Sequence, residues 1–567
     1  MYRHRVMISA AVVAAAIGFI PATAQAAGPS AEPGRSTATA GSAQNTSAQN
    51  TSAQDASAQD ASAQDASAQA AAKDAAAKDT AAKGANAKAG NAGAEYFEVG
   101  MGTSTSYAHT IGLATSVSTD QANSYAWYTV DWGDGTTNEE FGKADELVYL
   151  KHTYAEVGSH KITITATDKI AKLTSTTTKD VVVDGSEFTP HAPTRLLDTR
   201  DGTGAPAAGP VGANGTTRVK VVGNGGIPAG VTAVALNITA TNASAGGHVI
   251  AYASGKKQPA TSNVNFAAGQ TVPNLAIVPV GEDGYVELAN RSVGSVDLIA
   301  DVTGYFTRTA ASGYTSVKPS RLVDTRQGLG TAMGQAAAQS TFGVQIAGQG
   351  GLPAGVTAVA LNVTVTDPKG AGHLTAFPSG QQAPSTSSVN FAAGQTVANA
   401  VIVPVGPDGK INIRNGAWSP TDVIVDVTGY YSADGKAAYL PMEPERKYDS
   451  RAGSFPLPLA GQKYHTETVW TSGRALEALV LNTTVTNPQG SGHLSVAPDP
   501  NTMDDYISGK AVKPTPPDSS VLNWTPGATV SNLVQASTGT TGVIDFWNRG
   551  WDQTDLIVDL YGMYDKN

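Results

Sequence analysis

The C-terminal part of the chain contains short segments in which apolar and polar residues alternate. The clearest is residues 421–431, T-D-V-I-V-D-V-T-G-Y-Y. Val423, Val425 and Val427 point to one side of an extended chain, and Asp426 points to the other. The pattern predicts a β-strand with one buried face and one face that need not be buried.

Related segments at residues 296–306 and 554–564 indicate three copies of one unit. Each copy opens with an arginine-containing motif, P-T-R-L-L-D-T-R, P-S-R-L-V-D-T-R or P-E-R-K-Y-D-S-R, and its last arginine recurs after 126 and then 125 residues. This period is too long for a solenoid or propeller unit and long enough for a separate core. The third copy carries 13 extra residues in a Pro-rich stretch at 499–517, which predicts a surface loop.

We therefore predict three tandem homologous β-sandwich or jelly-roll domains, at residues 187–311, 312–435 and 436–567. We expect them to be separate domains in a row; the alternative is a single three-fold object. The repeats look like tandem β domains of secreted bacterial proteins that carry R-L-x-D-T-R and D-V-x-G-Y. That resemblance implies location and architecture but no chemistry.

A different unit precedes the repeats, at residues 95–186. It contains D-W-G-D-G-T at 131–136 and H-T-Y-A-E-V-G at 152–158, followed by an alternating strand at 160–167. Together these motifs resemble the polycystic-kidney-disease (PKD) domain, which implies an immunoglobulin-like sandwich that acts as a spacer or contacts proteins or glycans without catalysis. The sequence departs from the family pattern at Val130, Trp132 and His160.

The N-terminus has the features of an export signal. Arg3 and Arg5 precede an apolar run at 6–20, and Ala-Gln-Ala at 24–26 supplies a cleavage site. We predict a signal peptide at 1–26 and a low-complexity, disordered tether at 27–94, the latter because its apolar residues are nearly all Ala. A retained membrane anchor and a cross-linked wall-spanning arm are the alternatives. The mature protein is then secreted or attached to the cell surface, with no membrane segment.

The net charge and the absence of cysteine limit the classes of partner and metal site that the chain could have. The net charge of −10 argues against a nucleic-acid partner, and the absence of Cys excludes disulfides and thiolate metal sites. We expect no cofactor. The expected partners are cell-wall or extracellular polysaccharide, or surface proteins.

Recurrent Arg and Asp residues predict a structural clamp in each repeat. The first and last strands of a sandwich can be neighbours, so an Arg–carboxylate fork would tie them together. The predicted pairs are Arg200 with Asp301, Arg326 with Asp426, and Arg451 with Asp559. A ligand site in each copy is the alternative.

Two groups of residues could suggest a metal site, but we predict no metal site at either. Asp131, Asp134 and Glu139 lack the spacing of a calcium loop, and Asp at a turn usually bonds to nearby backbone N–H groups. A histidine recurs after Gly in each repeat and would meet its counterparts only if the copies surrounded an axis; these are His248, His373 and His493.

Aromatic residues mark the best candidate binding site. Four of the 7 Trp lie in the third repeat, and W-N-R-G-W at 547–551 occupies its last turn. Tryptophan offers a flat apolar face with an N–H group, which suits sugar rings or a protein groove. The predicted ligand-binding residues are Trp547, Trp551, Asn548, Arg549 and Trp418.

No nucleophile elbow, H-E-x-x-H motif or phosphate-binding Gly loop is present in the sequence. We therefore predict no enzyme activity. The predicted function is an exported, non-catalytic surface or matrix protein that binds glycans or proteins through its β domains. A purely structural spacer or cell-envelope component and a secreted hydrolase with unrecognised catalytic residues are the alternatives.

Overall fold

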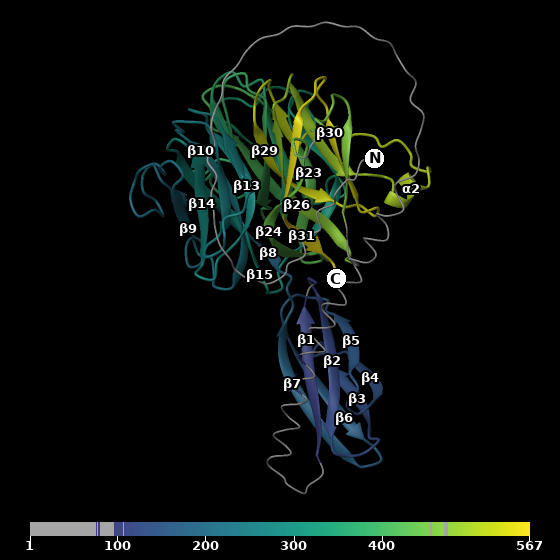
Figure 1. The fold of residues 1–567 in the computed structure, drawn as a ribbon. Helices are drawn as coiled ribbons and strands as arrows, with labels where there is room; N and C mark the ends of the chain where they lie inside the picture. Colours follow the sequence, from purple (N-terminus) through teal and green to yellow (C-terminus); the bar gives the residue numbers. More distant parts are fainter. Residues whose placement is uncertain (1–74, 76–77, 80–95, 106, 453–455, 470–473) are drawn as a thin grey trace, which may run out of the picture. The chain divides into compact units, whose positions relative to one another are not determined.

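The computed structural model describes residues 75, 78–79, 96–105, 107–452, 456–469 and 474–567. These residues form sheets almost throughout, which confirms the predicted all-β class (Figure 1). The predicted signal peptide and nearly all of the predicted tether lie outside the described residues. Within the described ranges, no helix is long and apolar enough to cross a membrane.

The first sandwich is built from two sheets, in the orders β1-β2-β5 and β4-β3-β6-β7. Its core includes Trp132, Tyr128 and Ile164, all nearly inaccessible to solvent. Its strands are β1 (Phe97–Thr105), β2 (Thr110–Thr119), β3 (Tyr125–Asp131), β4 (Thr137–Lys143), β5 (Val148–Thr153), β6 (Ser159–Asp168) and β7 (Leu173–Val182).

Each of the three repeats is a sandwich of two four-stranded sheets. The strand order is the same in all three repeats. In the first repeat the orders are β13-β10-β15-β8, called the inner sheet, and β12-β11-β14-β9, called the outer sheet. Its strands are β8 (Glu187–Asp198), β9 (Thr216–Lys220), β10 (Val231–Thr241), β11 (Gly247–Ala253), β12 (Val264–Phe266), β13 (Val272–Pro279), β14 (Tyr285–Ser292) and β15 (Asp297–Thr307).

The other two repeats follow the same plan, with inner sheets β16-β23-β18-β21 and β24-β31-β26-β29. The second repeat has β16 (Gly313–Asp324), β17 (Thr341–Gln345), β18 (Val356–Thr366), β19 (Gly372–Pro378), β20 (Val389–Phe391), β21 (Val397–Pro404), β22 (Lys410–Asn415) and β23 (Asp422–Ser432). The third has β24 (Ala438–Asp449), β25 (Tyr464–Thr468), β26 (Leu476–Thr486), β27 (Gly492–Pro498), α2 (Met503–Ile507), β28 (Leu522–Trp524), β29 (Val530–Ser537), β30 (Val543–Asn548) and β31 (Asp555–Asp565).

The inner sheets are buried on both faces. In β10, Val234 and Leu236 pack into the core of their own sandwich, whereas the alternating Ala233 and Ala235 face a second core. This second core also contains residues of the other two repeats, including Ala358 and Ala478 at the matching positions. Because small residues line the shared face, the three inner sheets can approach closely.

Six aromatic side chains fill one end of this shared core. Each repeat contributes one from the start of its first strand and one from the end of its last strand: Phe188, Phe306, Tyr314, Tyr431, Tyr439 and Tyr564. The Tyr431 and Tyr564 hydroxyl groups lie 2.6 Å apart and both accept from the Gln535 side-chain amide. The glycine of each D-V-x-G-Y motif is needed here, since a Cβ at Gly304 or Gly429 would collide with the ring of Phe188 or Tyr314.

A closed ring of asparagine contacts joins the three repeats. The Nδ2 of Asn399 donates to the Oδ1 of Asn237, at 2.9 Å, from the second repeat to the first. Asn532 donates in the same way to Asn362, at 3.0 Å, from the third to the second, and Asn274 to Asn482, at 2.9 Å, from the first to the third. Each contact is head-to-tail, and after three steps the ring returns to its starting repeat.

The predicted tandem β-sandwiches are confirmed, but the three repeats share a second core and do not stand apart, as the three-fold alternative has it. The period of the sequence allowed each copy its own core, and each copy has one. The sequence pattern did not show what covers the second face of each inner strand, which carries Ala and Asn. In the structure that face is covered by the neighbouring repeats.

We predict that the repeats unfold together and that Asn399→Ala destabilises all three. The substitution leaves the Asn237 Oδ1 and the Leu275 N–H without a partner, which costs about 2–3 kcal/mol of unfolding free energy. Scanning calorimetry of the whole chain should show one repeat transition that shifts to lower temperature. The exposed Gln327→Ala is the control. Independent melting of one repeat would contradict the shared core.

Candidate functional site

The turn between the last two strands of each repeat is held by a buried asparagine. In the second repeat, the Asn415 Nδ2 donates to the carbonyls of Ala336, Ala337 and Ser419 at 2.9–3.1 Å, and its Oδ1 accepts from the Ala417 N–H. Asn290 and Asn548 make the matching carbonyl contacts in the other repeats. The asparagine thus ties the turn to the loop that follows the first strand of the repeat.

The third residue after this asparagine projects into solvent in every repeat. Trp418 is 86% exposed, Trp551 is 85% exposed, and Val293, at the matching position of the first repeat, is 85% exposed. We call these three residues the tips. Because the backbone on either side is fixed by the asparagine, the two indole rings are presented from ordered turns.

The other predicted binding residues of this turn have different places. Trp547 is only 5% exposed and packs against Tyr464, with ring centroids 4.2 Å apart. Asn548 is fully buried and shapes the turn. Arg549 is partly exposed, and its backbone N–H donates to the His493 carbonyl. Of the predicted set, the structure therefore leaves Trp418 and Trp551 as the exposed aromatic residues.

The clamp exists, but the first arginine of the motif makes it. In the first repeat, Nε and Nη2 of Arg195 donate to the two oxygens of Asp301 at 2.9 and 3.3 Å. Arg321 holds Asp426 and Arg446 holds Asp559 in the same bidentate way. The strand register decides this pairing, because Arg195 lies directly opposite Asp301 on the adjacent strand.

The predicted clamp arginines instead bind the aspartate of their own motif. Arg200 donates from Nε and Nη2 to Asp198, at 2.9 and 2.7 Å, and Arg326 and Arg451 do the same with Asp324 and Asp449. Asp198 also accepts from Arg195 at 3.0 Å, so the four groups form one chain of ion pairs.

The carboxylates at the inner end of these chains are fully covered, contrary to the expectation that their face need not be buried. Asp301 and Asp426 are each 1% exposed and Asp559 is inaccessible. Burial raises the pKa of Asp301, while hydrogen bonds from Arg195 and the Ser387 backbone of the next repeat lower it. The two guanidinium contacts are those of an ionised carboxylate. These sites are therefore filled by the protein's own groups.

We predict that Arg321→Ala lowers the free energy of unfolding by about 3 kcal/mol, because it leaves the buried Asp426 without its partner. Arg326→Ala should cost less than about 1 kcal/mol, since that side chain is nearly half exposed and Asp324 keeps Arg321. Denaturant titration of both variants in the full chain measures the difference. Equal effects would contradict the assignment of the clamp to Arg321.

The recurrent histidines are partly buried. Burial lowers the pKa of His248, His373 and His493, in the last to about 4. An arginine of the same repeat adds to the effect in each case, and an arginine of another repeat adds to it further for two of them, Arg446 for His248 and Arg321 for His493. Each imidazole is therefore neutral at pH 7, and His248 and His493 lie near the clamp arginine of another repeat.

Asp131 and Asp134 of the first sandwich form turn contacts. The Asp131 Oδ1 accepts from the Gly133 N–H, and the Asp134 Oδ1 accepts from the N–H and hydroxyl of Thr136. His152 lies 2.7 Å from the other Asp134 oxygen. Among the side chains that the structure describes, no group of three or more His, Asp or Glu is placed to hold a metal ion.

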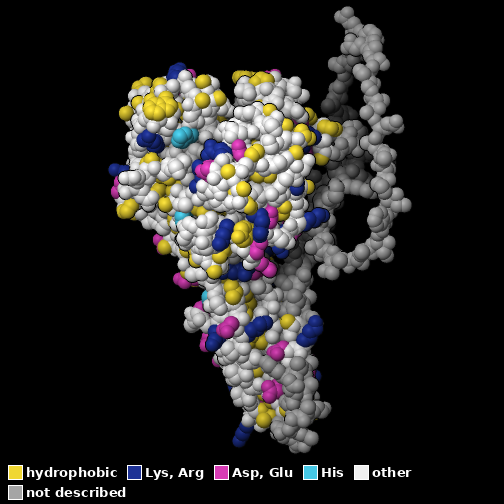
Figure 2. All heavy atoms as spheres, turned by 90° about the vertical axis from the view of Figure 1, so that its left-hand side faces the viewer, with side chains coloured by type: hydrophobic (Ala, Val, Ile, Leu, Met, Phe, Trp, Pro, Cys, Tyr) yellow, Lys and Arg dark blue, Asp and Glu magenta, His cyan; other side chains and the backbone are white. Residues whose placement is uncertain are grey.

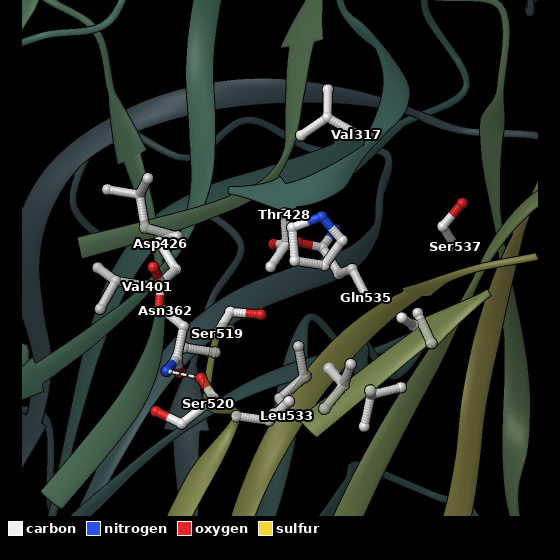
Figure 3. Close-up of a pocket in the computed structure, with 18 of the residues that line it drawn as sticks. Val317, Asn362, Val401, Asp426, Thr428, Ser519, Ser520, Leu533, Gln535 and Ser537 are labelled. Atoms are coloured by element: carbon white, nitrogen blue, oxygen red, sulfur yellow. Dashed lines mark hydrogen bonds between the residues drawn. The ribbon is translucent and has the colours of Figure 1, made fainter. Parts of the chain in front are cut away.

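A pocket opens between the second and third repeats (Figure 3). Val317, Thr428 and Ser519 contribute to its walls. Its amide and carboxyl groups already have partners: Asn362 donates to the Ser520 carbonyl, Gln535 donates to two tyrosine hydroxyls, and Asp426 is held by Arg321. The pocket therefore belongs to the packing between repeats.

The third repeat contains a carboxyl pair that the sequence did not single out. Asp499 and Asp545 are 2% and 1% exposed and lie beside the inserted loop. Burial, and then the adjacent Asp499 carboxyl, raise the pKa of Asp545 to about 7. Asp499 accepts from the Tyr506 hydroxyl at 2.5 Å and from Asn501, which lie in the inserted loop. Ser254 and Glu287 occupy these positions in the first repeat.

We predict that Asp545→Asn stabilises the protein more at pH 8 than at pH 5, by about 2–3 kcal/mol. The folded pKa of about 7 lies above the usual value of 3.8, so the folded state binds the proton more tightly. Stability from this group is therefore lost as pH rises between these values. Melting curves at both pH values test this, and a gain independent of pH would contradict it.

Comparison with known proteins bears on the first sandwich. A family profile described as the PKD domain matches residues 97–181, which span β1 to β7. Residues 97–181 form a PKD domain. Its Trp132 and Tyr154 lie in the core, and the Tyr154 hydroxyl donates to the Trp132 carbonyl, so the two motifs of the sequence meet in space. The match covers this domain and not the three repeats.

No curated protein matches the chain. Among solved structures, a SusE-like protein, BT2857, aligns at 12% identity over 36% of this chain and 96% of its own, with a TM-score of 0.12. A tetra-tandem repeat from the extending region of a large adhesion protein aligns at 13% identity over 84% and 100%, with a TM-score of 0.14. A triple-jelly-roll protein of an archaeal virus turret aligns at 9% identity over 67% and 90%, with a TM-score of 0.14. TM-scores this low carry no argument about function.

Proposed function

We propose that this is an exported, non-catalytic surface or matrix protein that binds polysaccharide through Trp418 and Trp551. The observation that carries the proposal is the exposure of both indole rings, at 86% and 85%, on matching turns. An isolated apolar ring of this size has no role in the core, and its flat face suits the C–H face of a sugar ring.

The rest of the site supports contact and not chemistry. The Asp and Arg residues of the clamps neutralise one another inside the protein, and burial lowers the pKa values of the recurrent histidines. Around the tips, the turn asparagine and backbone amides hold the turn, and the partly exposed Arg414 and Arg549 lie close by in the sequence. The rigid turn gives each tryptophan a fixed position without side-chain ordering on binding.

We predict that Trp418→Ala with Trp551→Ala weakens binding to cell-wall or extracellular polysaccharide fractions at least tenfold, since each lost ring contact is worth about 1 kcal/mol or more. Isothermal titration and pull-down measure the loss, and an unchanged melting temperature shows that the fold is intact. The first-repeat variant Val293→Ala is the matched control. Equal binding by both variants would contradict the proposal and favour a purely structural spacer.

A further inference from the structure

The three tips share one end of the repeat assembly. Each lies in the turn before the last strand of its repeat, at the opposite end of that strand from the aromatic cluster of the shared core. These turns therefore lie at the end of the last strands away from the aromatic cluster in all three repeats. The asparagine ring fixes the repeats relative to one another, so the tips keep a constant spacing.

Further apolar side chains lie in the loops that the turn asparagines hold. Met333 is 77% exposed and Leu457 is 75% exposed. Both follow the arginine motif of their repeat, and the same loops pair with the tip turns through the bridges Ala336–Thr421 and Leu459–Thr554. Figure 2 shows one face of the molecule, with hydrophobic side chains along this end.

Part of the charge at this end is paired. Arg326 and Arg451 belong to the same loops, and each is held by the aspartate of its motif. Arg291 and Arg414, beside the first and second tips, donate to neutral carbonyl and amide groups. The aromatic rings at the tips, and not the charge at this end, therefore indicate the partner. The tips also have no walls: with 85–86% of each side chain exposed, none can enclose a ligand.

On the basis of the proposed function, we propose that the tips act together on the flat face of an insoluble polysaccharide. A flat solid of packed chains can meet all three tips at once, whereas a single soluble chain offers no such surface. Joint contact gives avidity, since after the first tip binds, the others bind at high effective concentration. Val293 makes the first-repeat tip the weakest contact, because valine has no ring to stack.

The test is a gain of function at that position. Val293→Trp should raise the affinity for particles of microcrystalline cellulose or chitin about tenfold, measured by depletion of protein from solution. It should leave the affinity for soluble cellohexaose or chitohexaose within about twofold. The matched control is Val182→Trp, which places the same ring at an exposed valine of the PKD domain. A variant that loses Trp418 should weaken particle binding about tenfold.

The outcomes separate this inference from the proposed function. If Val293→Trp changes nothing, or improves particle binding no more than Val182→Trp does, joint contact is overturned while binding through Trp418 and Trp551 stands. Equal affinity of the wild type for soluble chains and particles also overturns joint contact. If neither cellulose, chitin nor the soluble chains bind, this inference is overturned. The proposed function is overturned as well if the cell-wall and extracellular polysaccharide fractions also fail to bind.

Discussion

The ring of asparagine contacts between the inner sheets is the interaction on which the repeat assembly depends. Apolar burial between the Ala-lined faces brings the sheets together. Because it is non-directional, it does not by itself fix the register of one sheet against the next. The Asn399–Asn237 contact and its two counterparts do, because a buried amide out of register would lose its partners. The ring also explains why Asp301 needs Arg195: closure of the interface removes the carboxylate from water.

A continuous series of hydrogen bonds and ion pairs connects this interface to the exposed turns. The inner strands carry the clamps, the clamps anchor the arginine-motif loops, and the turn asparagines tie those loops to the tips. Trp418 and Trp551 are therefore exposed side chains on turns whose backbone is held by hydrogen bonds. Binding residues on loops held by a rigid β scaffold are a common solution in recognition proteins.

Much of the fold could be predicted from the sequence, because strands with period-two alternation and a 125-residue repeat follow directly from residue positions. The closure of three copies could not, since Ala233 and Asn237 read equally well as solvent-facing positions. The clamp partner was also undetermined: both arginines of each motif recur at fixed spacing, and a register shift between Ala300 and Asp301 selects Arg195. Trp547 lies in the paired part of β30 and is buried, whereas Trp551 lies in the following turn and is exposed. The sequence pattern did not show where the strand ends, so it did not distinguish the two residues.

The ring joins repeats that belong to a single chain, and this frees them from symmetry. In a trimer of identical subunits, any substitution would appear three times and would have to suit every interface. Here the third repeat alone carries the inserted loop and the Asp499–Asp545 pair, while the first keeps valine at its tip. Each copy can therefore change its exposed loops separately by mutation while the shared core stays constant, which allows one scaffold to evolve three different contacts.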